Sequence, residues 1–222
     1  MIQVEIERKI INNGDLNVPC AILKPAEYVG AVLVVHGYGG FKEETLGLAW
    51  RIAEQGFITG AIDLRGHGEH PMELDENLLL DLETSISYFK QFGKVTAIGH
   101  SLGGRLSLIS SADYAIGIAP ALNKTYSSQT QELIEEMRDY RVRKSNSNIF
   151  DILNNLPQYQ IKDDKVFILH GSRDIPEIIS ECNKLKSEGI DIVQINEALH
   201  GDIFLFEPTF KAVNDKIKEW YK

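Results

Sequence analysis

The stretch Gly99-His100-Ser101-Leu102-Gly103 follows an apolar run, Val95 to Ile98, and precedes a segment of helical periodicity. A serine on a sharp strand-to-helix turn needs small residues two positions away on each side, because a larger side chain would collide with the adjoining backbone. Gly99 and Gly103 meet that need. The start of the helix would also direct backbone N–H groups and its positive dipole end toward the serine. The stretch predicts a nucleophile elbow, although a glycine-rich turn without chemical role can share its pattern.

Length and composition indicate one soluble domain, residues 1–222. Hydrophobic residues make up 43% of the chain and charged residues 25%, close to the average for globular proteins. The net charge is −9 with basic residues spread along the chain, which argues against nucleic acid or a membrane surface as a partner. Residues 1–9 alternate apolar and polar side chains and carry several charges, so we expect no signal peptide and a cytoplasmic location. Cys20 and Cys182 lack the spacing of a metal site or disulfide framework, and we expect both to be reduced.

The pattern along the chain predicts an α/β fold. Residues 2–11 and 16–23 form an expected antiparallel hairpin around the turn Asn12-Asn13-Gly14-Asp15. Apolar runs then alternate with helix-like segments, which is typical of a mostly parallel, twisted sheet of about eight strands with helices on both faces. The apolar runs are 31–35, 57–62, 95–98, 115–119, 166–169 and 190–195. The expected helices are 43–55, 76–92, 102–111, 176–188 and 209–221.

Residues 122–164 interrupt this alternation and predict a small helical cap inserted within the domain, called the cap segment below. Its run from Glu132 to Lys144 is strongly charged, which favours a solvated face. Four apolar residues at helical spacing favour packing on the main domain, or a face that roofs a pocket; they are Leu133, Ile134, Met137 and Tyr140. The aromatic residues of the segment are candidates for internal packing or for lining that pocket; they are Tyr126, Tyr140, Phe150 and Tyr159.

Polar residues cluster in the loops that follow the apolar runs. In an open parallel sheet, ligands bind outside the carboxyl ends of the strands, and all six histidines fall in or near these loops. They are His36, His67, His70, His100, His170 and His200. We expect His36, His100 and His170, each next to a strand end, to bond the backbone. His67 and His70 would bind substrate or bond their own loop; as a metal pair they lack a third ligand, and we predict no metal and no cofactor.

A serine hydroxyl needs a base within about 3 Å and an acceptor that orients that base. Ser101, Asp174 and His200 follow one another in the order serine, acid, histidine, and the last two lie in loops after apolar strands. Asp174 has a second interpretation, as a helix N-cap ahead of Pro176. Other carboxylates lie at the wrong end of a strand or too close to His200 in sequence. These are Asp163, Asp164, Asp191 and Asp202.

Five motifs together resemble the α/β-hydrolase superfamily, in particular its small serine esterases and acyl hydrolases. They are the elbow 99–103, His-Gly-x-Gly-Gly at 36–40, Asp-Leu-Arg-Gly-His-Gly at 63–68, His-Gly-Ser-x-Asp at 170–174 and His-Gly at 200–201. The resemblance implies an oxyanion hole formed by the backbone N–H groups of Tyr38 and Leu102. A serine at position 101 is unlike the superfamily members with aspartate or cysteine nucleophiles.

These observations favour a carboxylesterase that cleaves small to medium acyl esters through an acyl-enzyme, with Ser101, Asp174 and His200 as the triad. An acyl thioesterase or acyltransferase with the same triad remains the nearest alternative. A small peptidase and a catalytically silent ligand-binding module are further alternatives. The expected partner is a small-molecule ester, and the sequence leaves a homodimer open.

Overall fold

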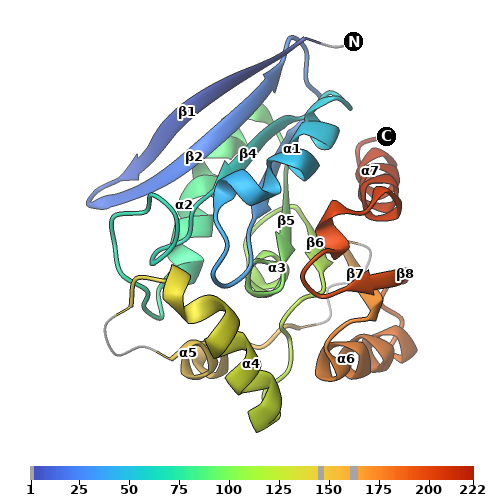
Figure 1. The fold of residues 1–222 in the computed structure, drawn as a ribbon. Coiled ribbons are helices and arrows are strands. Elements are labelled where there is room, and N and C mark those ends of the chain that lie inside the picture. Colours follow the sequence, from blue (N-terminus) through green and yellow to red (C-terminus); the bar gives the residue numbers. More distant parts are fainter. Residues whose placement is uncertain (1–2, 145–147, 161–164) are drawn as a thin grey trace.

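The computed structural model describes residues 3–144, 148–160 and 165–222. An eight-stranded sheet in the order β1-β2-β4-β3-β5-β6-β7-β8 runs through the molecule (Figure 1). The β1–β2 and β2–β4 pairs are antiparallel, and every later pair is parallel. The mostly parallel α/β sheet with an N-terminal antiparallel hairpin is therefore confirmed.

The strands are β1 (Val4–Asn13), β2 (Leu16–Pro25), β3 (Ala31–Val35), β4 (Ile58–Ile62), β5 (Val95–His100), β6 (Tyr114–Ile118), β7 (Val166–Arg173) and β8 (Ile192–Leu199). The α-helices are α1 (Leu46–Ala53), α2 (Leu78–Phe89), α3 (Leu102–Ile109), α4 (Ser128–Arg138), α5 (Ile149–Asn155), α6 (Pro176–Ser187) and α7 (Glu207–Trp220). Short 3-10 turns are η1 (Lys42–Thr45), η2 (Lys90–Phe92), η3 (Asp139–Arg141) and η4 (Ile203–Leu205).

The N-terminal hairpin has a tighter turn than the sequence predicts. Asn13 pairs with Leu16 across the two strands, so only Gly14 and Asp15 form the turn, and Gly14 has a positive φ of 60°. Two-residue turns of this kind match the right-handed twist of the flanking strands. The expected first strand began at Ile2, which lies outside the described residues.

Three parallel strands continue past the apolar runs that predicted them. β5 includes His100, β7 extends to Arg173, and β8 extends to Leu199. Backbone pairing sustains a strand whatever its side chains are, so an apolar pattern marks the buried part of a strand and not its end. Some residues that the sequence placed in loops at the carboxyl edge, such as His100 and His170, therefore belong to strands.

Helices cover both faces of the sheet and bury a separate core on each. One core joins the sheet to α1, α6 and α7, through residues such as Ile52, Ile178 and Val213. The other joins it to α2, α3 and α5, through residues such as Leu82 and Leu106. Among the described residues, no helix combines the length and the apolar character needed to cross a membrane.

The cap segment contributes α4, η3 and α5, and residues 145–147 and 161–164 of it lie outside the described residues. Figure 1 shows α4 and α5 at the end of the molecule opposite the N-terminus. Ser127 begins α4 by accepting a bond from the backbone N–H of Thr130, and Asn148 begins α5 by accepting one from Phe150. Two local N-caps therefore define where the helices of this segment start.

Candidate active site

Ser101 lies at the sharp turn between β5 and α3 with φ 52° and ψ −113°. A positive φ is uncommon for any residue with a side chain and concentrates at functional sites. A Cβ added to Gly99 would lie 2.1 Å from the carbonyl carbon of Gly103, so no larger residue fits at position 99. The backbone N–H of Ser101 donates to the carbonyl of Ile118 on the neighbouring strand, at 2.9 Å. Close packing and a strand contact thus hold the serine in this conformation.

The structure brings Ser101, His200 and Asp174 together in one hydrogen-bonded row. His200 Nε2 lies 3.0 Å from Ser101 Oγ, and His200 Nδ1 lies 2.8 Å from Asp174 Oδ1. A carboxylate only accepts, so Nδ1 carries the proton and Nε2 of the neutral ring is free to accept one from the serine. The three residues come from the ends of β5, β7 and β8, which the parallel sheet aligns at one edge.

Asp174 is buried at the end of β7 and is supported by two backbone donors. Gly171 donates to Oδ2 at 3.1 Å and Ile175 donates to Oδ1 at 2.8 Å. Burial alone would raise the pKa of Asp174, but the hydrogen bonds from His200 and these two amides outweigh it and hold the pKa below its usual value. The N-cap of α6 is Ile175, so the helix-cap interpretation of Asp174 is wrong.

The loop that holds Tyr38 lies against Ser101. A Cβ added to Gly37 would lie 3.2 Å from Ser101 Cβ and 2.9 Å from His100 Nδ1, so only glycine brings this loop so close. Leu102 is the first residue of α3, where a backbone N–H has no partner within the helix. The Tyr38 hydroxyl donates to Asp139 Oδ1 at 2.6 Å. The side chain of Tyr38 thus reaches the cap segment, while its backbone follows the glycine that contacts the serine.

The other histidines bond to nearby backbone. His36 Nε2 accepts from the Leu64 N–H at 3.1 Å, His67 Nδ1 donates to the Arg65 carbonyl at 2.9 Å, and His70 Nδ1 accepts from Met72 at 3.2 Å. His170 Nδ1 lies 3.1 Å from the carbonyl of Gly171. In the described part of the chain, no three His, Cys, Asp or Glu side chains form a group able to hold a metal ion.

His100 does more than bond the backbone next to it. Its Nε2 donates to the carbonyl oxygen of His200 at 2.7 Å, and the two rings lie 4.9 Å apart. Burial is the main cause that lowers the pKa of His100 to about 3, and the neighbouring His200 and Arg138 add to it. The ring is therefore neutral at physiological pH and connects the elbow to the loop of His200.

A pocket of about 420 Å³ opens above Ser101, and we call it the Ser101 pocket. Its walls are mainly apolar and come from the cap segment, from α6 and from η4. The apolar wall includes Ala121, Tyr126, Ile134, Ile149, Phe150, Leu153, Ile175, Ile178, Phe204 and Leu205. Of the four aromatic residues that the sequence singled out, Tyr126 and Phe150 line this pocket. Tyr140 is 81% exposed, and Tyr159 borders a second cavity.

The face of α4 that lines the pocket differs from the expected one. Ile134 and Arg138 lie four residues apart, share one helix face, and both line the pocket. Leu133 and Met137 are more than half exposed, so the expectation that the apolar stripe packs on the main domain is wrong for them and for Tyr140. The physical reason is that the face of Leu133 and Met137 is offset by one residue from the face of Ile134 and Arg138. Helical spacing alone does not distinguish the two faces, and only packing selects between them.

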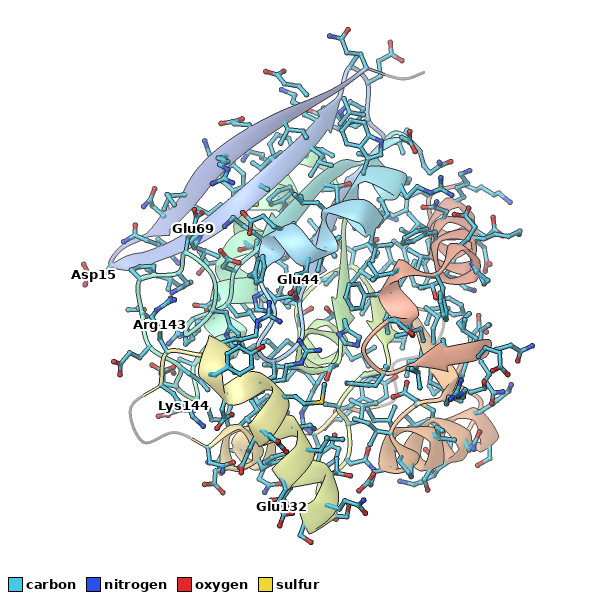
Figure 2. All side chains as sticks on the ribbon, in the orientation of Figure 1. Asp15, Glu44, Glu69, Glu132, Arg143 and Lys144 are labelled. Carbon is cyan, nitrogen blue, oxygen red and sulfur yellow. The ribbon has the colours of Figure 1, made fainter. Side chains whose placement is uncertain are left out.

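Arg138 is a charged residue of this site that the sequence did not reveal, because it lies within a run expected to be solvated. Glu44 also lines the pocket, and its carboxylate pairs with Arg141. In the view of Figure 2, Glu44 appears between α1 and α4, whereas Glu132 lies toward the end of α4 that is farther from α1. The spacing of Arg138 from Ile134 was the one signal that could have placed it at the pocket.

Solved structures share this fold over nearly the whole chain. An esterase from Pyrobaculum calidifontis has a TM-score of 0.64 at 19% identity, covering 95% of this chain and 82% of its own. Est1E from Butyrivibrio proteoclasticus has a TM-score of 0.68 at 16% identity, covering 96% and 98%. A dienelactone hydrolase from Anabaena variabilis has a TM-score of 0.66 at 18% identity, covering 99% and 97%. Identities this low establish the shared fold alone.

Sequence comparisons point to the same group. Ethanol acetyltransferase 1 from Eremothecium cymbalariae is 31% identical over 91 residues, which are 37% of this chain and 24% of that protein. The chain thus spans about a quarter of the length of that curated relative. The family model described as serine aminopeptidase, S33, matches residues 26–146, which is more than half of the chain and includes Ser101. The chain therefore belongs to the serine aminopeptidase S33 family of α/β hydrolases, the superfamily that its motifs resemble.

Proposed function

We propose that the protein is a serine hydrolase that cleaves carboxylic esters through an acyl-enzyme intermediate. The observation that carries the proposal is the row of hydrogen bonds from Ser101 through His200 to Asp174, at 3.0 and 2.8 Å. A serine hydroxyl is a weak nucleophile at neutral pH, and an oriented imidazole within hydrogen-bond reach is what activates it.

The proposed reaction begins when His200 Nε2 takes the proton of Ser101 as Oγ attacks the ester carbonyl carbon. The carbonyl oxygen becomes an oxyanion, which the backbone N–H groups of Leu102 and Tyr38 would stabilise. His200 then gives its proton to the alkoxide oxygen as the C–O bond breaks, and the alcohol leaves. Water repeats the sequence on the acyl-enzyme and releases the acid, while Asp174 keeps the imidazole in one tautomer throughout.

The Ser101 pocket supports small to medium acyl groups as the substrate class. Its apolar wall would bury an acyl chain next to the nucleophile, and burial of each CH₂ contributes about 0.8 kcal/mol. We propose that the cap segment, residues 122–164, acts as a roof within the single domain 1–222, because Tyr126, Ile134 and Phe150 of this segment face the same pocket as Ser101. No cofactor enters the proposed reaction.

The family description raises a second candidate, release of an amino acid from a peptide N-terminus. An aminopeptidase must bind an α-ammonium group, which calls for a free carboxylate near the nucleophile. Glu44 lines the pocket but pairs with Arg141, and Arg138 lines the pocket as a cation. This charge distribution favours the ester over the peptide. Hydrolysis of alanine p-nitroanilide at a rate comparable with that of p-nitrophenyl acetate would reverse the preference.

The match to an acetyltransferase raises a third candidate, transfer of the acyl group to an alcohol or from a thioester. The same acyl-enzyme serves all of these reactions, and only the donor and the acceptor differ. Addition of ethanol to the assay would give an ethyl ester if alcohol outcompetes water. Acetyl-CoA compared with p-nitrophenyl acetate would separate a thioesterase from an esterase.

Replacement of the nucleophile tests the proposal. Ser101→Ala should lower kcat on p-nitrophenyl acetate by about 10⁶-fold and should abolish labelling by a fluorophosphonate probe. Ser87→Ala is the matched control, because the Ser87 hydroxyl is exposed and donates only to the Glu83 carbonyl within α2. If Ser101→Ala protein hydrolysed the ester as fast as the parent and Ser87→Ala, the proposal would be wrong. A parent protein that resists the probe would instead point to a silent binding module.

A further inference from the structure

Arg138 lies between the loop of Tyr38, one of the proposed oxyanion donors, and the loop of His200, the proposed base. A Cβ added to Gly39 would lie 2.8 Å from Arg138 Cβ and 3.0 Å from its Cδ, so the arginine stem packs on that glycine. A Cβ added to Gly201 would lie 3.8 Å from Arg138 Nη2. Gly39 follows Tyr38 and Gly201 follows His200 in sequence. The Arg138 side chain thus contacts the residue that follows Tyr38 and lies near the residue that follows His200.

The guanidinium of Arg138 has no hydrogen-bond or ion-pair partner among the described residues, although the side chain is only partly exposed. Of the three acidic residues within three positions of it, Glu136 is exposed, and the other two are engaged elsewhere. Asp139 accepts from the Tyr38 hydroxyl and pairs with Lys144, and Glu135 accepts from Asn148 at 2.9 Å. The five N–H donors of the guanidinium are therefore without an acceptor among the described residues, since the Glu44 carboxylate of the same pocket pairs with Arg141.

The cation at Arg138 contrasts with the chain as a whole, which carries a net charge of −9. An anionic substrate would be repelled by the overall field, so it needs a local cation to enter the pocket. Among the described lining residues, Arg138 is the only lysine or arginine. One guanidinium matches a monoanion such as a carboxylate, which it can bind through two parallel N–H bonds.

We propose that Arg138 binds a carboxylate on the substrate, so that the protein prefers esters that carry a carboxylate in their acyl or alcohol half. This inference rests on the proposed ester hydrolysis and adds a substrate class to it. The apolar wall of the Ser101 pocket would take the hydrocarbon part of such a substrate, and the guanidinium would take its charged end. Binding at two separated points orients the ester carbonyl toward Ser101.

A purely structural role for Arg138 makes a different prediction. A cation in the last turn of a helix stabilises the helix dipole, and Arg138 is the last residue of α4. Loss of that contribution would lower thermal stability and would affect all substrates alike. The ratio of two substrates matched in size but different in charge therefore separates the two roles.

The test compares matched pairs of esters. Mono(4-nitrophenyl) adipate against 4-nitrophenyl hexanoate places the carboxylate in the acyl half, and 4-acetoxybenzoate against phenyl acetate places it in the alcohol half. The parent protein should show a higher kcat/KM for the anionic member of at least one pair, and added NaCl should reduce that preference. In Arg138→Met, which keeps an apolar stem, the anionic-to-neutral ratio of that pair should fall about 10- to 100-fold, mainly through KM.

Two variants complete the test. Arg138→Lys should recover part of the anionic-to-neutral ratio, because lysine retains the positive charge but lacks the paired N–H donors of the planar guanidinium. Arg51→Met removes one charge from α1, outside the pocket, and should leave the ratio as in the parent. A parent protein with no anionic preference in either pair, or an unchanged ratio in Arg138→Met, would overturn the inference. Ser101-dependent hydrolysis of the neutral esters would in that case still support the proposed function, whereas its absence would remove both.

Discussion

His100 Nε2 donates a hydrogen bond to the backbone carbonyl oxygen of His200 at 2.7 Å. The two residues are one hundred positions apart in sequence, and one precedes the nucleophile while the other is the proposed base. The loop of His200 is thereby bound to the elbow itself through one buried, neutral imidazole, in addition to the bond from the His200 ring to Asp174. Phe204 packs on the His100 ring, with centroids 4.8 Å apart, and limits its movement.

We therefore expect His100→Ala to lower kcat on p-nitrophenyl acetate by about 10- to 100-fold, because small displacements of a catalytic group have effects of this size. The rate of fluorophosphonate labelling should fall in parallel. His100→Gln, whose amide can donate in place of Nε2, should recover part of both. Unchanged labelling in His100→Ala would show that the loop holds its place without this bond.

Asp174→Asn should lower kcat by about 10³- to 10⁴-fold. An amide at this position can donate to His200 Nδ1 and favour the tautomer in which Nε2 carries the proton and cannot accept one. Its NH₂ group would also face the N–H donors of Gly171 and Ile175. Asp202→Asn is the control, since the Asp202 carboxylate accepts from the Leu199 N–H in the same loop. Equal losses in the two variants would contradict the role proposed for Asp174.

Lys42 is a buried cation outside the site, with a side chain only 1% exposed. Its Nζ lies 2.7 Å from Asp63 Oδ2 and 2.7 Å from Glu69 Oε2; Figure 2 shows Glu69 beside the β1–β2 hairpin. Asp63 is fully buried, whereas Glu69 is more than half exposed. Removal of one partner from a buried pair typically costs about 3–5 kcal/mol, because the remaining charge, here that of Asp63, stays buried. Lys42→Met should lower the free energy of unfolding by that amount in urea titrations.

A surface lysine provides the comparison. Lys211 pairs with Asp215 on α7, where both side chains are more than half exposed, and such pairs contribute at most about 1 kcal/mol. Lys211→Met should therefore leave the urea midpoint close to that of the parent. Similar shifts in Lys42→Met and Lys211→Met would contradict the importance of burial at Lys42.

His67 links folding stability to pH. It is fully buried, and burial is the main cause that lowers its pKa from 6.5 to about 3. Between these two values the unfolded chain binds a proton that the folded protein does not, so the free energy of unfolding falls as pH drops below 6.5. The slope for one such proton is ~1.4 kcal/mol per pH unit.

His67→Asn removes the imidazole that takes up this proton in the unfolded chain, and it retains an amide that can donate to the Arg65 carbonyl. The slope of unfolding free energy against pH, measured by urea titration between about pH 4 and 6, should become shallower by the equivalent of one proton. Parallel slopes in parent and variant would mean that His67 titrates alike in both states.

The alternation of apolar runs and helical segments was sufficient to predict the sheet, because parallel strands covered on both faces are apolar along their buried part. The elbow was equally predictable, since Gly99 and Gly103 are required by contacts that span only a few residues. The triad candidates followed from their positions after strands. Strand ends were less predictable, as β7 shows, because backbone pairing continues to Arg173 whatever the side chains are.

The sequence by itself determined the order of the strands along the chain, the turn at Ser101 and the identity of the residues at the carboxyl edge, because short-range sterics and hydrophobic periodicity act within a few residues. Only the tertiary structure decided that Ile134 and Arg138, and not Leu133 and Met137, face the pocket. It also decided that His100 reaches the carbonyl of His200. Such choices depend on how distant elements pack, and no local spacing encodes the position of a partner one hundred residues away.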